Sequence, residues 1–268
     1  MNSSVGIYMP AYNVGDYVKE AISSLTWQSY SDWELVFIDD CSEDDTFKNA
    51  QSVVKASDNR VSFYKREEHC GRIGQVKNEA IAKLSKKHEY ICHVGSDDTV
   101  PKNCLETFVT YMDKHPEIGA CCGNFICFND EGKQWSFPHV SNAGDYNPNT
   151  LLQYMCLFPM RFYRWAVIDT IGGYSNELTS AVDYDLALKI DEIAKIHRIK
   201  DPITYYYRQH SQQVSTRSRS EQDLNAKKAL ESALVRRGIN AIVKNAAPPF
   251  ILERKESEEE KHFIWGGK

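Results

Sequence analysis

The sequence predicts an α/β protein in which a mainly parallel, doubly wound sheet is followed by a smaller region and a closing C-terminal helix. Through the first hundred residues, short apolar segments typical of strands alternate with segments whose apolar residues recur at helical spacing. Repeated strand–helix units favour parallel strands joined by right-handed crossovers. Polar clusters follow three of these strands, at the position where open α/β sheets bind ligands.

In the first hundred residues we expect four strands, at residues 5–9, 34–38, 61–64 and 90–94. Three helices alternate with them, at residues 14–28, 44–56 and 74–84. The second helix follows a polar, acidic stretch at residues 42–45, which offers an N-cap and a favourable first turn. Asp58, Asn59 and Arg60 form a turn before the third strand.

The pattern becomes irregular after Pro101, which is why a smaller, separate region is expected there. The expected helices lie at residues 104–114, 150–157, 183–193 and 218–237. The expected strands lie at residues 119–129, 158–163 and 202–208, and a loop spans residues 135–150. Gly238 ends the last helix, and the charge run at residues 253–261 indicates a solvated helix or linker.

Composition narrows the class of protein. The chain has 268 residues, of which 42% are hydrophobic and 26% charged, as in ordinary globular proteins. A formal net charge of −5 argues against nucleic-acid binding, and no apolar run reaches the roughly 20 residues of a membrane span. The first residues lack the basic and apolar regions of a signal peptide, so a cytoplasmic location is expected. The eight cysteines include no C-x₂-C pair and are expected to be reduced and mostly buried.

Four polar clusters outline a candidate site, at residues 10–13, 39–42, 95–98 and 183–185. The first three follow predicted strands, so their side chains are expected to meet at one edge of the sheet. Several carboxylates around one small volume require a cation or a basic partner to neutralise them. The pattern therefore predicts a site for a divalent metal and a nucleotide.

These clusters, in this order and spacing, resemble the family-2 inverting glycosyltransferases with the GT-A fold. The similarity continues through residues 172–174, 181–185 and His210, and covers roughly residues 4–240. Residues 160–192 and 237–240 look most like the N-acetylhexosamine-adding domain of bacterial chondroitin- and hyaluronan-type synthases. The resemblance implies one domain over residues 1–240, with a nucleotide-binding half (1–100), an acceptor half (101–240) and a tail or linker (241–268).

The resemblance also implies a binding role for several residues near the donor nucleotide. Asp40 is similar to the carboxylate that accepts a hydrogen bond from N3 of uracil, which suits a group that can only accept. The alternative for Asp40 is that it belongs only to an acidic turn at the N-terminus of a helix. The other donor-binding residues implied are Pro10, Ala11, Tyr12 and Asn13 along the base and ribose, Gly71, Arg72 and Lys77 in a closing segment, and Ser96 and Asp98.

The metal ligands implied by the resemblance are Asp97 and His210. Gly95 stands where the family has the first Asp of its Asp-x-Asp signature, which leaves Asp97 as the acid of that motif. Hard oxygen ligands beside a diphosphate suit Mn²⁺ or Mg²⁺. The alternatives are a helix cap for Asp97 and a surface or core residue for His210. Arg208, Arg217 and Arg219 would either neutralise the leaving diphosphate or form a solvated basic loop.

Asp183 resembles the general base of the family, although Val182 replaces a Glu that many relatives carry before it. An inverting transfer needs a carboxylate that takes the proton of the acceptor hydroxyl, since no covalent intermediate forms. An N-cap role for Asp183 is the alternative. Met160, Arg161 and Asp185 are implied on the side of the donor sugar and the acceptor.

The expected function is transfer of GlcNAc or GalNAc from a UDP donor to a saccharide or glycolipid acceptor, in capsule, lipopolysaccharide or other surface polysaccharide synthesis. One alternative is a hexosyltransferase that uses UDP-glucose or UDP-galactose. Another is an inactive nucleotide-sugar-binding module of a larger assembly. Partners would bring the cytoplasmic protein to the inner face of the cell membrane.

Overall fold

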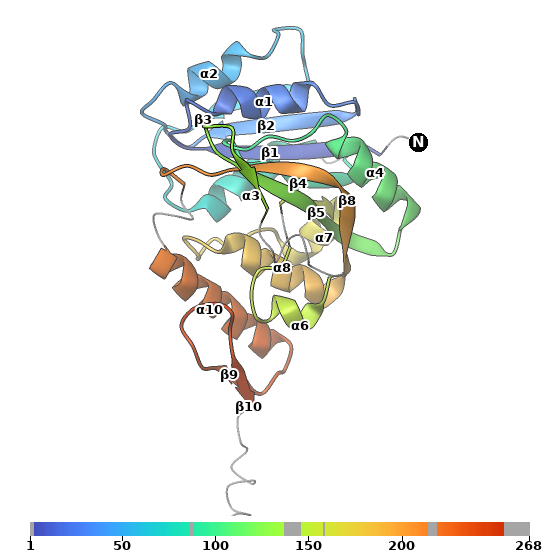
Figure 1. The fold of residues 1–268 in the computed structure, drawn as a ribbon, viewed down its shortest axis with the longest axis vertical. Coiled ribbons are helices and arrows are strands. Elements are labelled where there is room, and N and C mark those ends of the chain that lie inside the picture. Colours follow the sequence, from blue (N-terminus) through green and yellow to red (C-terminus); the bar gives the residue numbers. More distant parts are fainter. Residues whose placement is uncertain (1–2, 86–87, 137–145, 158, 214–218, 255–268) are drawn as a thin grey trace, which may run out of the picture.

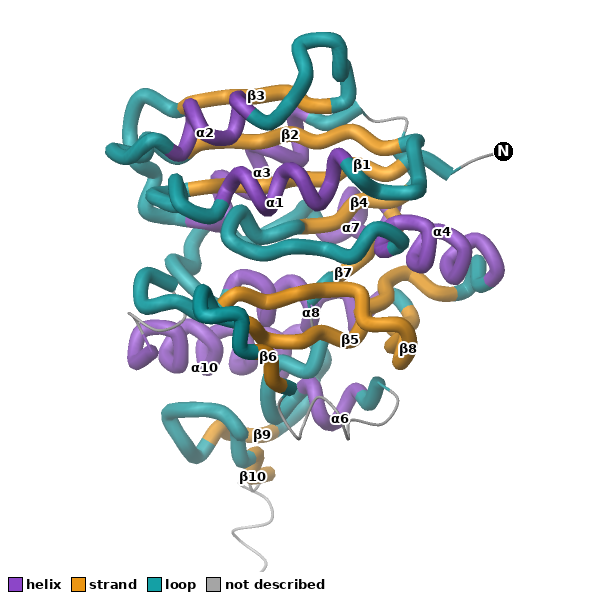
Figure 2. Tube along the Cα trace, turned by 45° about the horizontal axis from the view of Figure 1, so that its top comes forward, coloured by secondary structure: helices purple, strands orange, loops and turns teal. Residues whose placement is uncertain are grey.

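A computed structural model describes residues 3–85, 88–136, 146–157, 159–213 and 219–254 of the chain. Eight strands form one sheet, with the spatial order β3-β2-β1-β4-β7-β5-β6 and with β8 paired to β5. Figure 2 shows these strands side by side, with the first half of the chain at one end of the sheet and the second half at the other. The predicted α/β class with a mainly parallel sheet is confirmed.

The first half builds the parallel part of the sheet. Its strands are β1 (Val5–Ala11), β2 (Trp33–Asp39), β3 (Val61–Lys65) and β4 (Tyr90–His93), and each neighbouring pair runs parallel. The helices are α1 (Val18–Thr26), α2 (Thr46–Ser52), α3 (Ile73–Lys83) and α4 (Cys104–Lys114). All of these elements were expected from the sequence, with ends that differ by a few residues.

The second half adds antiparallel pairs. β7 (Arg161–Arg164) lies between β4 and β5 (Ile118–Phe128) and runs antiparallel to both, while β8 (Lys195–Arg208) pairs with β5 in parallel. The short β6 (Gln134–Trp135) completes the sheet. The helices of this half are α6 (Pro148–Leu151), α7 (Trp165–Ile171), α8 (Val182–Ile193) and α10 (Arg219–Arg236).

Helices cover both faces of the sheet, which explains why β1 is apolar along its whole length. Ile7 and Met9 pack in one apolar cluster with residues of α1 and α4. Tyr8 points to the other face and packs in a second cluster with residues of α3, α8 and α10. Figure 1 shows α1 and α2 close to β1–β3, and α8 and α10 in the lower half of the molecule. The central strands are therefore buried between two apolar clusters, one on each face of the sheet.

Four elements of the second half differ from the prediction. The expected helix at 150–157 is only the four-residue α6, and neither β6 nor α7 was expected. Most of the predicted loop at 135–150 lies outside the described residues. β8 begins at Lys195, seven residues before the predicted start at Pro202. Its register against β5 shifts between the Arg198 and Ile203 pairs, and Pro202 lies inside that shift. Proline is tolerated in a strand at such an irregularity, so Pro202 interrupts the sequence pattern without ending the strand.

The first part of the predicted tail or linker is folded. β9 (Ala241–Val243) and β10 (Leu252–Arg254) form an antiparallel hairpin. Phe250 is buried, lies 6.4 Å from the ring of Tyr184 on α8, and donates its backbone N–H to Gln153 O at 2.7 Å. This hairpin therefore packs on the main domain, while most of the predicted charge run lies outside the described residues. None of the helices in the described part of the chain is long and apolar enough to cross a membrane.

Candidate active site

The ends of β1, β2 and β4 bring Tyr12, Asp40 and Asp97 to the carboxyl edge of the parallel sheet. Asn13 ties the first two loops together, because its backbone N–H donates to Ser42 Oγ at 2.9 Å and its side-chain oxygen accepts from Glu43 N at 3.0 Å. Asn13 adopts a positive φ of 52°, which asparagine tolerates better than most residues. The predicted donor-binding loops therefore lie together, as their positions after the strands implied.

Asp40 is a buried acceptor. It accepts the backbone N–H of Cys70 at 3.0 Å, Arg66 Nε lies 3.0 Å from Oδ1, and His69 Nδ1 lies 2.9 Å from Oδ2. Burial raises the pKa of Asp40 above its usual value, although Cys70, His69 and Arg66 oppose that rise. These contacts are long-range in sequence, so Asp40 is more than an acidic residue at a helix start.

Neighbouring residues, and not Asp40, cap the turn before α2. Asp39 accepts the backbone N–H of Ser42 at 3.1 Å, and Asp44 accepts that of Thr46 at 2.9 Å. The turn before α2 thus has its own acceptors, and the Asp40 carboxylate points to the segment that follows β3.

Tyr12 presents a ring at the same edge, and 41% of the residue is exposed. The ring of His69 stacks on it with centroids 4.0 Å apart and planes inclined by 22°. Pro10 and Ala11, which precede Tyr12, are buried within β1. A partly exposed aromatic ring beside a buried carboxylate can hold a planar base by stacking and by one hydrogen bond.

Asp97 and His210 lie together although 113 residues separate them. His210 Nε2 is 3.1 Å from Asp97 Oδ2, and the His210 ring lies 4.4 Å from that of Tyr17. His210 is buried, and its Nδ1 has no hydrogen-bond partner within the described part of the chain. A buried imidazole facing a carboxylate is neither a surface residue nor an apolar core residue, which favours the predicted pairing.

These two side chains fit a divalent ion that binds few protein groups. Ligands about 2.1 Å from an octahedral ion lie about 3 Å apart at neighbouring positions, close to the observed separation of the two atoms. The residues that the structure describes contain no group of three or more His, Cys, Asp or Glu side chains arranged for a metal. Asp97 and His210 would therefore hold an ion only together with a diphosphate and water.

The loop at residues 95–98 is fixed by β8. Tyr205 Oη accepts the backbone N–H of Gly95 at 2.9 Å and donates to Asp98 Oδ2 at 2.8 Å. Asp98 Oδ1 accepts the backbone N–H of Arg208 at 2.8 Å. Burial, followed by the charge of Asp97, raises the pKa of Asp98 well above its usual value. The structure thus places Asp98 in the support of the loop, and Ser96 is buried beside it.

Gly95, at the position of the first signature acid, lies close to the side chains of Asp97 and Asp98. A Cβ atom at this position would lie 2.4 Å from Asp98 Oδ2 and 3.0 Å from Asp97 Oδ1. The first separation is well below van der Waals contact, so any residue other than glycine at position 95 requires the Asp98 carboxylate or the loop to move.

Arg208 is a cross-link and does not stand free for a diphosphate. Its Nε donates to Asp97 O at 2.9 Å, its Nη1 donates to Asp130 Oδ1 at 3.0 Å, and its Nη2 contacts Glu20. Arg219 lies 3.8 Å from Asp223 at the start of α10, and Arg217 lies outside the described residues. The basic groups that contact Asp183, the residue predicted to be the general base, come from other elements.

Those basic groups are Lys77 of α3 and Arg161 of β7, which enclose the carboxylate of Asp183. Lys77 Nζ donates to Oδ1 at 2.8 Å, and Arg161 Nη2 lies 3.4 Å from Oδ2. Lys77 is only 3% exposed. Burial would raise the pKa of Asp183, but the charges of Arg161 and Lys77, with a smaller effect of His93, outweigh it and hold that pKa well below its usual range.

The position of Asp183 in α8 also favours the ionised carboxylate. Ala181 is the N-cap residue and adopts a left-handed conformation, which places Asp183 in the first helical turn. The helix dipole favours a charged carboxylate there. His93 ends β4 opposite Arg161 of β7, so Asp183 lies near the strand that leads to Asp97. Burial and the charge of Lys77 lower the pKa of His93 well below its usual value, so its ring is neutral.

The remaining predicted residues have varied surroundings. Arg72 donates to Asn176 O at 3.0 Å and follows Gly71, whose φ is +66°. Met160 is fully buried. Asp185 is buried and pairs with Lys189 at 2.8 Å, one turn further along α8. Within the described part of the chain, none of these three side chains forms a hydrogen bond or ion pair with Asp183 or Asp97.

The residues that the sequence reading missed are Arg66, His69, Cys70 and His93. Three of them follow β3, a strand whose carboxyl end lies beside that of β2. The rule that pointed to the loops after β1, β2 and β4 applies equally there, so the position was a usable signal. His93 lies inside a strand and carries no such signal.

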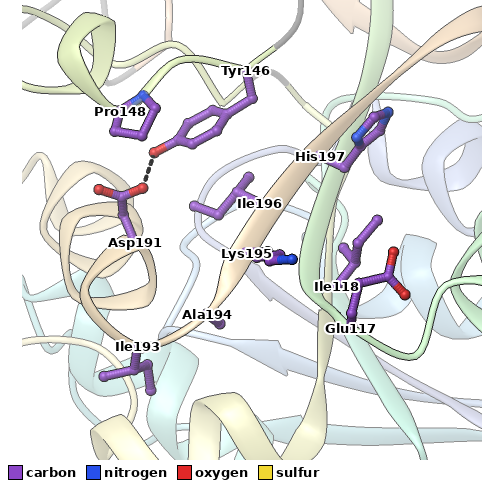
Figure 3. A pocket seen from close by; sticks show the side chains of 10 residues that line it. All are labelled: Glu117, Ile118, Tyr146, Pro148, Asp191, Ile193, Ala194, Lys195, Ile196 and His197. Carbon is purple, nitrogen blue, oxygen red and sulfur yellow. Dashed lines mark hydrogen bonds between the residues drawn. The ribbon is translucent and has the colours of Figure 1, made fainter.

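A cavity of about 570 Å³ lies where β5 and β8 begin. Its lining contains none of the predicted site residues. Its lining comes from the starts of those strands, the end of α8 and the segment before α6: Glu117, Ile118, Tyr146, Pro148, Asp191, Ile193, Ala194, Lys195, Ile196 and His197. Tyr146 donates to Asp191 across it at 2.5 Å (Figure 3). It is separate from the carboxylates at the carboxyl edge.

Comparison with known proteins shows the family of the chain. Residues 6–172 match the profile described as glycosyl transferase family 2. Over 235 residues the chain is 27% identical to a chondroitin synthase of Escherichia coli, a match that covers 88% of this chain and 33% of that protein. Over 143 residues it is 32% identical to a putative teichuronic acid biosynthesis glycosyltransferase of Bacillus subtilis (strain 168), a match that covers 53% of this chain and 55% of that protein. The chain thus spans about a third of the chondroitin synthase.

Solved structures confirm the fold. TarS 1–349 of S. aureus in complex with UDP-GlcNAc superposes with a TM-score of 0.73 at 20% identity, covering 87% of this chain and 66% of that one. A mannosyltransferase of Pyrobaculum calidifontis in complex with GDP-Man and Mn²⁺ gives a TM-score of 0.63 at 17% identity, covering 93% of this chain and 67% of that one. At these identities the likeness concerns the fold alone.

Proposed function

Because the chain belongs to glycosyl transferase family 2, we propose that it is a metal-dependent, inverting glycosyltransferase that uses a UDP-sugar. The sugar transferred is GlcNAc or GalNAc, and the acceptor is a saccharide or glycolipid of cell-surface polysaccharide or lipopolysaccharide synthesis. The match to a chondroitin synthase and the likeness to a fold solved with UDP-GlcNAc support this choice of donor.

The observation that carries the proposal is the carboxylate of Asp183 between Lys77 and Arg161. A partly exposed acid with two largely buried basic partners stays ionised, as a group that must accept a proton requires. The same two cations also lower its basicity, and a general base works best when its pKa approaches the working pH. An anionic donor that competes for Lys77 and Arg161 would therefore raise the basicity of Asp183 when substrate is present.

The nucleotide is held by the loops after the strands. Asp40 accepts N3–H of uracil, and Tyr12 provides a surface on which the base stacks. Asn13, whose contacts fix the loop after β1, keeps both groups in place. Gly71 and Arg72 form the segment that approaches the nucleotide from the other side.

Asp97 and His210 would hold Mn²⁺ or Mg²⁺, which would offset the charge that develops on the leaving diphosphate. Tyr205 and Arg208 fix the loop that carries Asp97, so that its carboxylate does not need to reorganise during the reaction. The loop at residues 95–98 and the side chain of Asp183 would hold the donor and the acceptor in the orientation of the reaction. Such positioning lowers the activation barrier of the transfer.

Two alternatives use the same site. A hexosyltransferase would take UDP-glucose or UDP-galactose into the same loops. An inactive nucleotide-sugar-binding module is favoured by one observation, the glycine at position 95 where the family signature has an acid. The carboxylate of Asp183 between Lys77 and Arg161 argues against it, because a module that only binds the donor needs no general base.

Release of UDP from UDP-GlcNAc, UDP-GalNAc, UDP-glucose and UDP-galactose, measured with and without Mn²⁺, tests the proposal. Metal-dependent release from an N-acetylhexosamine donor, increased by added saccharide acceptors, is the expected result. Release from a hexose donor alone would favour the first alternative. Tight UDP binding without turnover of any donor would favour the inactive module.

A further inference from the structure

His69 lies where the proposed nucleobase would lie. Its ring stacks on Tyr12 with centroids 4.0 Å apart, and its Nδ1 lies 2.9 Å from Asp40 Oδ2. A uracil ring held by this site would make the same two interactions, a stack on the tyrosine and an N–H donated to the carboxylate. The imidazole is a planar ring with an N–H, so it reproduces the chemistry of the expected ligand.

The carboxylate of Asp40 is surrounded by three nitrogen groups in this arrangement. Cys70 N donates to both oxygens, at 3.0 Å and 3.2 Å, while Arg66 Nε lies 3.0 Å from Oδ1 and His69 Nδ1 lies 2.9 Å from Oδ2. His69 Nδ1 also lies 3.2 Å from the backbone oxygen of Asp40. An N–H donor that approaches Oδ2 from the side of Tyr12 must therefore take the place of His69 Nδ1.

His69 is the donor best placed to leave. The Cys70 donor is a backbone group, and Arg66 is held a second time by Glu79. The His69 side chain is 44% exposed, and the separation of its ring from Tyr12 leaves no space for a third ring between them. A base that stacks on Tyr12 from this side must therefore displace the imidazole.

We propose that His69 is a built-in competitor of the nucleobase, which occupies the slot between Tyr12 and Asp40 until a uridine nucleotide replaces it. The inference rests on the proposed function, since it takes UDP as the nucleotide. A base that stacks on the face of Tyr12 covered by His69 must displace the imidazole, and only a base with an N–H donor restores a donor to Asp40. When UDP leaves after transfer, His69 refills the slot.

Calorimetric titration of UDP in the presence of Mn²⁺ tests this directly. His69→Ala should bind UDP about tenfold more tightly than wild type, the equivalent of about 1.4 kcal/mol, because no hydrogen bond has to be broken first. His69→Phe keeps the stack and removes the donor, so its affinity should lie between the two. His115→Ala, at a partly exposed histidine paired with Glu117, is the matched control and should leave UDP affinity unchanged.

Unchanged or weaker UDP binding by His69→Ala would overturn the inference, because a histidine that helps to hold the base gives a loss when removed. A second measurement uses the unmodified chain: the ring nitrogen resonances of His69 should shift on addition of UDP as Nδ1 loses Asp40. If UDP binds and those resonances stay in place, the competitor role is wrong and the proposed function stands. If neither protein binds UDP, both fall.

Discussion

Lys77 Nζ lies 2.8 Å from Asp183 Oδ1, an ion pair between α3 and the first turn of α8 that spans 106 residues of sequence. Lys77 also lies 4.8 Å from the centre of the Tyr174 ring, and Tyr174 shares a hydrogen bond of 2.7 Å with Tyr8 of β1. The proposed base is thus connected to the centre of the sheet through one lysine. The ion pair with Lys77 both holds the Asp183 side chain and lowers its pKa.

Asp183→Asn is expected to fold and bind UDP normally while transferring almost no sugar. Asparagine keeps the shape of the side chain but cannot take a proton, and loss of a general base typically costs about 10²–10⁴ in rate. Transfer rates and UDP titrations on the same preparation check this. Asp169→Asn, at an exposed position on α7, is the control and should retain full activity. Transfer near the wild-type rate by Asp183→Asn would leave only a structural role for this residue.

Lys77→Met is expected to raise the pKa of Asp183, because one of the two cations that lower it is removed while burial remains. Transfer by this variant should therefore decline as the pH is lowered, over a range in which the wild type stays active. Rate profiles on the acid side of neutrality measure the effect. Lys83→Met, in the last turn of the same helix, should leave the profile unchanged. Identical profiles for wild type and Lys77→Met would contradict the expected coupling.

The same ion pairs predict how stability depends on pH. The folded pKa of Asp183 lies below its unfolded value of about 3.9, so the stabilisation is complete above that value and is lost as the pH falls further. The difference in unfolding free energy between wild type and Asp183→Asn should therefore shrink on acidification. Urea titrations of both proteins in mildly and strongly acidic buffers measure it. A constant difference would show that Asp183 is not depressed.

Chelation is expected to abolish transfer, and Mn²⁺ or Mg²⁺ should restore it. Asp97→Ala should reproduce the loss even with excess metal, since the leaving diphosphate then lacks its counter-charge. His210→Ala should raise the metal concentration needed for half-maximal rate and have a smaller effect at saturation. Full turnover in excess EDTA would rule out the metal role of both side chains.

Gly95→Ala is expected to destabilise the chain by about 1–3 kcal/mol, the usual cost of forcing an atom into a packed site. The new Cβ would lie 2.4 Å from Asp98 Oδ2, so the loop must shift. Thermal unfolding measures the loss. In an Asp98→Ala background the same change should cost less, because the clash is absent, and a non-additive pair of effects is the expected signature. Strict additivity would show that the two positions do not interact.

The sequence predicted the parallel half of the sheet well because its signals are local. Each of β1, β2 and β4 is a short apolar run followed by polar residues, and the loop positions of Asp40 and Asp97 follow from that order. The antiparallel insertion of β7 between β4 and β5 has no local signal, since it depends on contacts between residues about 70 positions apart. The start of β8 was missed because Pro202 interrupts an otherwise continuous strand pattern.

The candidate site was predictable where position after a strand decided it and unpredictable where tertiary packing did. Arg208 was expected near a diphosphate, yet its buried guanidinium joins Glu20, Asp97 and Asp130. Lys77 was expected at the nucleotide, and its ion pair with Asp183 could only be seen in three dimensions. Charge alone did not distinguish a structural cation from one that serves the site.

The contact between position 95 and Asp98 links the signature position to the support of the loop. While Asp98 stays bonded to Tyr205, a side chain at position 95 can be accommodated only if the Asp98 carboxylate or the loop moves. Removal of Asp98 would free that space, but it would take the acceptor from Tyr205 and from the backbone N–H of Arg208. A sequence search that requires an acid at the first signature position would therefore pass over this chain, although its loop keeps Asp97 and Asp98.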